Sequence, residues 1–113
     1  MSSINRKVGS LGGKVENVYL SEILVDSSYQ RGVKPHARKI EKNFIPAAAG
    51  ILQVGRRWKK DDDEHKSALY IIDGLQRLTA MKNLGIGTWK ALFIESSGST
   101  FEAQIFKILN GNR

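Results

Sequence analysis

The chain has 113 residues, 41% of them hydrophobic and 26% charged, a composition typical of one small folded domain with a single core. It contains no cysteine, which excludes disulfides, thiolate catalysis and cysteine-ligated zinc sites. No apolar run is long enough to span a bilayer, and the first residues lack the apolar core of a signal peptide. We therefore expect a cytoplasmic protein with no membrane partner.

The formal net charge of +7 is unevenly distributed along the chain. Residues 1–60 hold 12 Lys or Arg against 4 acids, whereas residues 61–113 hold 6 against 7. Such a basic half is typical of proteins that bind phosphate-rich partners, although a solvated basic surface without that role explains the same charge. We expect DNA as the main partner, with a protein partner or a second copy of the chain as alternatives.

The first 14 residues are rich in Ser, Gly and basic residues, which predicts a flexible basic tail, followed by one folded domain over 15–113. The apolar pattern then predicts a strand over 15–20, a turn at Ser21 and Glu22, and a second extended piece. The side chains expected to face the core in this part are Val18, Leu20, Ile23 and Val25.

In the middle of the chain, the sequence predicts a helix over 35–43, which Pro46 ends, and then a strand over 51–57. The helix is expected to bury Ala37, Ile40 and Phe44. A charged segment, 58–67, separates that strand from another over 68–72, which predicts a hairpin. Its adjacent acids, Asp61, Asp62 and Asp63, do not favour a metal site, because neighbours on a loop do not converge on one ion.

Two helices and a strand are predicted in the last third of the chain. Apolar residues at three-residue steps predict a helix over 75–84 with Leu75, Leu78, Met81 and Leu84 inward, and a strand follows over 89–94. Ser99 and Glu102 have the spacing of a capping box, so a last helix is expected to begin near Thr100. Its expected inward residues are Phe101, Ile105 and either Ile108 or Leu109.

The most distinctive stretch runs from the strand ending at Ile72, through Asp73 and Gly74, into the helix that begins at Leu75. Backbone N–H groups at a helix N-terminus lack intrahelical partners and lie at the positive end of the helix dipole, so this turn can bind an anion. Arg77 in the first turn adds a forked cation that suits a phosphate. The alternative is structural, with Asp73 simply capping the helix.

The segment Asp73-Gly74-Leu75-Gln76-Arg77 resembles the DGQHR or DGQQR motif of phage and plasmid members of the ParB/sulfiredoxin-like superfamily. Upstream, Ser28-Tyr29-Gln30-Arg31 is similar to the Tyr-Gln-Pro-Arg stretch of ParB N-terminal domains. Residues 42–54 resemble the part that joins the first helix of those domains to the next strand. The resemblance implies an α/β fold with a small mixed, partly curled β-sheet and about three helices.

Several activities of the superfamily can be compared with these residues. Leu75 stands where sulfiredoxins have their nucleophilic Cys, so that chemistry is excluded. Leu75 and Gln76 also replace residues of the Gly-Glu-Arg-Arg motif of ParB clamps, which argues against the same CTP-gated clamping. The DGQHR-like families are associated with nucleotide binding and with NTP-stimulated nuclease modules. The resemblance thus implies a nucleoside triphosphate, CTP or ATP, with Mg²⁺, and NTPase or DNase activity as the enzymatic option.

The same resemblance implies roles for individual residues. Asp73 and Arg77 are the catalytic candidates, and Asp73 is also the metal candidate. The nucleotide-binding candidates are Gly74, Gln76, Arg77, Arg31 and Tyr29, with Tyr29 stacking on a base. In the alternative arrangement, Tyr29 belongs to the core and Arg31 is exposed. The histidines, His36 and His65, lack the spacing of metal ligands and are expected at the surface.

The competing function is that of a non-catalytic phage or plasmid interaction protein, which binds DNA or a host protein through its basic N-terminal half. The basic side chains around the first helix and the following strand are the DNA-binding candidates: Lys34, Arg38, Lys39, Lys42, Arg56 and Arg57.

Overall fold

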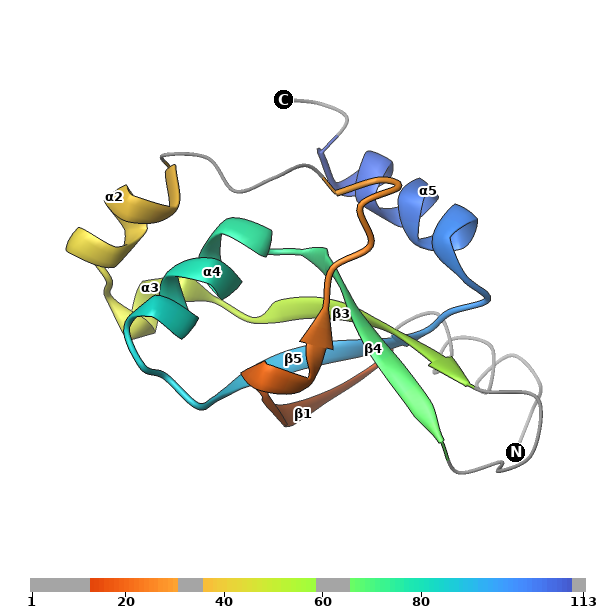
Figure 1. Cartoon of the computed structure of the whole chain (residues 1–113), viewed down its shortest axis with the longest axis horizontal. Coiled ribbons are helices and arrows are strands. Elements are labelled where there is room, and N and C mark those ends of the chain that lie inside the picture. Colours follow the sequence, from red (N-terminus) through yellow and green to blue (C-terminus); the bar gives the residue numbers. More distant parts are fainter. Residues whose placement is uncertain (1–12, 31–35, 59–65, 111–113) are drawn as a thin grey trace.

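A computed structural model describes residues 13–30, 36–58 and 66–110 of the chain (Figure 1). Its elements, in chain order, are β1 (Lys14–Tyr19), the single 3₁₀ turn η1 (Leu20–Glu22), β2 (Ile23–Leu24), α2 (His36–Lys42), α3 (Pro46–Ala49), β3 (Leu52–Trp58), β4 (Ser67–Asp73), α4 (Leu75–Asn83), β5 (Thr88–Glu95) and α5 (Ser99–Asn110).

The five strands form one mixed sheet in the order β1-β5-β3-β4-β2. β1 pairs with β5, and β3 with β4, in antiparallel fashion, whereas β5 with β3 and β4 with β2 are parallel. The α/β class and the mixed sheet agree with the sequence-based expectation, and the predicted β3–β4 hairpin is confirmed. The described part contains four α-helices rather than three, because Pro46 begins the single turn α3, a position at which its fixed φ suits a helix.

One face of the sheet packs against α4, and this layer holds the main core. Leu78 and Met81 of α4 are buried together with Leu52 and Val54 of β3 and with Ile71 of β4. Leu75 packs against the same cluster, as predicted. Burying these side chains removes several large aliphatic groups from water, each contributing about 1.5–3 kcal/mol to folding. The core therefore fixes α4 directly after the end of β4.

The opposite face of the sheet packs against α5. Successive residues of a strand point to opposite faces, so Gly55 and Arg57 lie on the side away from Val54. A Cβ atom at Gly55 would lie 2.8 Å from Oε2 of Glu102 on α5. A glycine at this position thus allows α5 to bring a carboxylate against the backbone of β3.

The structure corrects several expected inward residues. Val25 is 47% exposed, because it lies beyond the two-residue strand β2, and Leu84 is 45% exposed at the C-terminal cap of α4. On α5, Ile108 is 72% and Leu109 is 37% exposed. The buried face of α5 is centred on Glu102 instead, and Ile108 lies about 120° around the helix from it.

None of the helices in the described part is long and apolar enough to cross a membrane. Of the predicted basic tail, residues 1–12 lie outside the described part, and the chain joins the sheet at Lys14 in β1.

Candidate functional site

The turn between β4 and α4 is built around Gly74. This residue is the N-cap of α4 and has a left-handed backbone, with a φ of 109°. A Cβ atom there would lie 2.7 Å from Cδ2 of Leu52 and 3.0 Å from Nη2 of Arg77, so both the conformation and the space require glycine. The cap has no side-chain hydrogen bond among the described residues. Gly74, and not Asp73, therefore occupies the N-cap position of α4.

Arg77 ties the start of α4 to the chain between α3 and β3. Its Nη1 donates to the carbonyl oxygens of Ala49, at 2.5 Å, and Ile51, at 3.2 Å. Its Nη2 lies 3.5 Å from Oδ2 of Asp73, and the two side chains are 25% and 27% exposed. Arg77 thus forms one wall of the turn while keeping its charge at the positive end of the helix.

The chemistry available at this turn is anion binding. The bond from Leu78 N–H to Gly74 C=O begins the hydrogen-bond ladder of α4, so the N–H groups of the first turn, which precede it, have no acceptor within the helix. No cluster of three metal-ligating side chains occurs in the described part of the chain. A single carboxylate such as that of Asp73 fits the mode in which Mg²⁺ is held by one carboxylate together with phosphate oxygens.

The candidate Tyr29 lies in a different set of contacts. Its ring packs at 5.9 Å, centroid to centroid, against Phe106 of α5. Its hydroxyl oxygen lies 2.7 Å from Oε1 of Glu102 and 3.0 Å from the carbonyl oxygen of Ile71. Burial, and then the bond to Glu102, raise the pKa of Tyr29 far above its ordinary value. These contacts correspond to the alternative in which Tyr29 belongs to the packed interior.

Gln30 touches the candidate site more directly than the sequence suggested. Its side chain is buried, and Nε2 donates to the carbonyl oxygens of Ile71, at 3.0 Å, and Ile72, at 2.7 Å. These carbonyls immediately precede Asp73 and Gly74. Within Ser28-Tyr29-Gln30-Arg31, the available signal was an amide, a side chain that can bond backbone carbonyls, next to a large aromatic residue.

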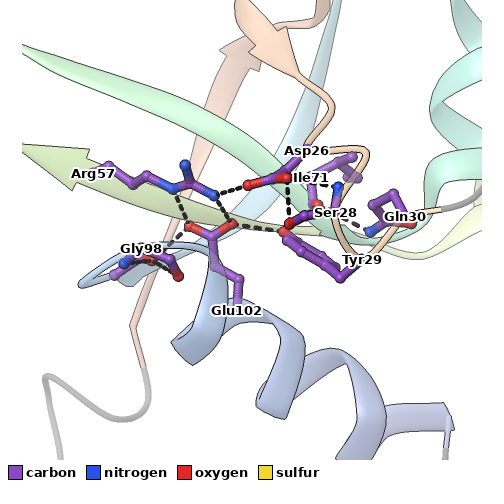
Figure 2. Close-up of polar contacts among 9 residues, drawn as sticks. Asp26, Ser28, Tyr29, Gln30, Arg57, Ile71, Gly98 and Glu102 are labelled. Carbon is purple, nitrogen blue, oxygen red and sulfur yellow. Dashed lines mark hydrogen bonds and ion pairs between the residues drawn. The ribbon is translucent and has the colours of Figure 1, made fainter.

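A network of charged side chains joins α5 to β3 (Figure 2). The side chain of Glu102 is 0% exposed and accepts bonds from Arg57 Nε and Nη2, both at 2.7 Å, and from Ser96 Oγ at 2.5 Å. Arg57 Nη2 also lies 2.6 Å from Oδ2 of Asp26. The sequence missed this network because the Ser-x-x-Glu spacing at Ser99 pointed to a local cap for Glu102.

The network keeps its acids charged. Burial raises the pKa of Glu102, but the bonds from Arg57, Ser96 and Tyr29 outweigh it, so the net pKa lies below its ordinary value. The bond from Arg57, with further bonds from Ser28, lowers the pKa of Asp26 to about 2. The bonds to Glu102 in turn raise the pKa of Arg57. Asp26, Arg57 and Glu102 are therefore ionised at neutral pH.

The DNA-binding candidates among the described residues fall into three sets. Arg57 is held by Glu102 and Asp26, and Arg56 pairs with Glu95 at 2.7 Å while its guanidinium lies over the Trp58 ring. The exposed cations of α2, none of which pairs with a described acid, are Arg38, Lys39 and Lys42.

The remaining candidates lie outside the described residues. They are Arg31, Lys34, Asp61, Asp62, Asp63, His65 and the side chain of His36.

No protein-family model and no curated protein sequence matches the chain. Solved structures do match: a C-terminally truncated chromosome-partitioning protein ParB from Caulobacter crescentus, complexed with CTP-γ-S, has a TM-score of 0.61 at 16% identity. A Pnob8-like ParB-N domain has a TM-score of 0.63 at 18% identity. The match covers 89% of this chain in both cases, but only 54% and 38% of those chains.

The comparisons show that this α/β chain has a ParB N-terminal-like fold. The chain thus has the fold that the sequence resemblance implied, and it spans about half of the first of these proteins and less of the second.

Proposed function

We propose that the protein binds the phosphates of a nucleoside triphosphate, together with Mg²⁺, at the turn between β4 and α4. The observation that carries the proposal is the left-handed Gly74 at the N-terminus of α4, where no side chain caps the helix. The proposal is supported by the shared fold with a ParB protein that was solved with CTP-γ-S. A helix start of this kind binds phosphate through backbone N–H groups, which need no particular side chains.

The side chains around the turn have distinct roles in this proposal. Asp73 holds Mg²⁺ against the phosphate oxygens, and Gln76 contributes its side-chain amide as an orienting group. Arg77 neutralises phosphate charge from the wall that it forms with Ala49 and Ile51. Hydrolysis of the nucleotide, or of DNA, would use the same Asp73 and Arg77.

Isothermal titration of the whole chain with CTP, ATP and GTP, with and without Mg²⁺, tests this proposal. We expect saturable binding to at least one triphosphate, weakened by Arg77→Ala. Lys82→Ala is the matched control, because Lys82 is an exposed cation in the last turn of the same helix. Absence of binding by the wild-type chain, or equal loss in both variants, would refute the site.

A second function, DNA binding, is favoured by the exposed cations of α2. Arg38, Lys39 and Lys42 are exposed on one short helix, and none pairs with a described acid. We propose that this helix contacts the phosphate backbone of DNA without reading its sequence. Replacing Lys39 by Ala should reduce the slope of log affinity against log salt concentration for duplex binding by the amount that corresponds to about one phosphate contact. Lys107→Ala on α5 is the control and should leave it unchanged.

A further inference from the structure

Near the C-terminal end of β4, the carbonyl groups of Ile71 and Ile72 bond to a side chain rather than to a neighbouring strand. On one side, β2 pairs with β4 only at Leu69 and Tyr70. On the other side, the pairing with β3 shifts register at Gln53 and Val54, so that Ile72 falls between two paired positions. The carbonyl groups of Ile71 and Ile72 instead accept hydrogen bonds from the Gln30 side chain. Bulges of this kind commonly lie beside functional sites, where they re-aim the chain.

The segment that carries Gln30 is in turn fixed by the buried network. Asp26 begins this segment, its carbonyl oxygen accepts bonds from the N–H groups of Tyr29 and Gln30, and its carboxylate binds Arg57. The Tyr29 hydroxyl lies within hydrogen-bond distance of both Ile71 and Glu102. Figure 2 shows these side chains converging between α5 and the strands. A continuous set of contacts thus runs from α5 to the end of β4.

We propose that Glu102, Tyr29 and Gln30 are positioning residues for the turn between β4 and α4, so that the seating of α5 controls the geometry of the phosphate site. Glu102 holds α5 on the sheet, Tyr29 transmits its position, and Gln30 fixes the two carbonyls that precede Asp73. The importance of this control for ligand binding rests on the proposed function, whereas the mechanical coupling does not.

Three physical features support a coupling that is local to this end of the sheet. Glu102 is completely buried, so moving its carboxylate away from Arg57 would leave a buried charge without its cation. Tyr29 has one hydroxyl hydrogen for two acceptors, so a change at Glu102 alters its bond to Ile71. Gln30 is 6% exposed, so water does not readily replace its bonds to the two carbonyls.

Hydrogen–deuterium exchange on the full chain, without nucleotide, tests the coupling. Glu102→Gln, Tyr29→Phe and Gln30→Met each keep side-chain size and remove one link. We expect exchange at residues 74–78, measured at the Leu78 amide that donates to the carbonyl oxygen of Gly74, to be about tenfold faster in Glu102→Gln and Gln30→Met, as when a buried acceptor loses its hydrogen bond. Tyr29→Phe should give a smaller change. Amides of β1 and β5 should keep their wild-type rates in all three.

The control is Glu95→Gln, which removes a carboxylate from Arg56, the neighbour of Arg57 on β3. Exchange at residues 74–78 should be unchanged in this variant. Wild-type rates at residues 74–78 in both Glu102→Gln and Gln30→Met would overturn the proposal. It would also be overturned by a uniform increase that includes β1 and β5, because these residues would then stabilise the fold as a whole.

Nucleotide titration of the same variants separates this proposal from the proposed function. If the wild-type chain binds a triphosphate, we expect the affinity to fall about tenfold in Gln30→Met, as after loss of one hydrogen bond's positioning effect. If Gln30→Met shows faster exchange but unchanged nucleotide affinity, the proposal that α5 controls the phosphate site is overturned. If the wild-type chain binds none, faster local exchange would still establish the coupling while the proposed function fails.

Discussion

Two neighbouring arginines of β3 have opposite roles in this protein. Arg56 and Arg57 are almost equally exposed, at 25% and 24%, and each pairs with a carboxylate at about the same distance, 2.7 Å. The partner of Arg56, Glu95, is 44% exposed, whereas the partner of Arg57, Glu102, is 0% exposed. Because adjacent strand residues point to opposite faces, one arginine meets the solvent-facing end of β5 and the other meets α5.

This difference teaches that the burial of the carboxylate, and not the geometry of the pair, sets the importance of each arginine. Water screens an exposed pair and can replace either partner, so such pairs contribute about 0–1 kcal/mol. A buried carboxylate that loses its cation has no such replacement. Separating Arg56 from Glu95 therefore costs little free energy, whereas separating Arg57 from Glu102 and Asp26 costs more.

The largest expected effect is that of Arg57→Met. This change keeps most of the side-chain volume but leaves Glu102 buried without its cation, which should lower the free energy of unfolding by about 3–5 kcal/mol. Urea unfolding followed by circular dichroism measures it. The double variant Arg57→Met, Glu102→Leu should be less destabilised than Arg57→Met alone, since the unpaired charge is gone. A loss below about 1 kcal/mol in the single variant would contradict the contrast with Arg56.

Gly55→Ala tests the close approach of α5 on the same face. Alanine is ordinarily better than glycine in a strand, but the new Cβ atom would lie 2.8 Å from Oε2 of Glu102 and displace the carboxylate from Arg57. We expect a loss of about 1–3 kcal/mol, the range found for overpacked interiors. Thermal unfolding measures it. Gly87→Ala is the control, because a Cβ atom there meets nothing within 4 Å.

The acid limb of the stability curve should report Asp26. Its pKa is lowered from 3.8 to about 2 by Arg57 and Ser28, so folding favours its charged form. The resulting stabilisation is fully present above pH 3.8 and disappears as the pH falls through about 2. The lowered pKa of Glu102 adds to stability with the same sign. Urea unfolding between pH 6 and pH 2 should be less pH-dependent in Asp26→Asn, and equal slopes would rule out this account.

The smallest effect is expected for Glu95→Gln, on the exposed side of β3. Arg56 keeps its contacts with the rings of Trp58 and Phe93, so the free energy of unfolding should change by less than about 1 kcal/mol. The difference from wild type should shrink further in high salt. A loss comparable to that of Arg57→Met would show that exposure does not separate the two pairs.

Sequence patterns anticipated the elements of the fold because these depend on neighbouring residues. The β-branched run before Asp73, the glycine at position 74 and the apolar spacing of Leu75, Leu78 and Met81 predicted the turn that joins β4 to α4. The hairpin followed from two β-like runs around a charged segment. Resemblance of the same segments to ParB N-terminal domains supplied the mixed sheet, which the comparisons bear out.

The environment of the charged residues could not be predicted in the same way, because it depends on contacts between segments far apart in the chain. Glu102 matched a local capping pattern and Arg57 a basic surface, yet they meet each other across 45 positions. Gln30 reaches β4 across 42 positions to bond a carbonyl that irregular pairing leaves without a strand partner. Hydrophobic periodicity and turn residues act over a few neighbours and are therefore visible in the sequence. Whether a charge is buried, and beside which partner, depends on how the two faces of the sheet are covered.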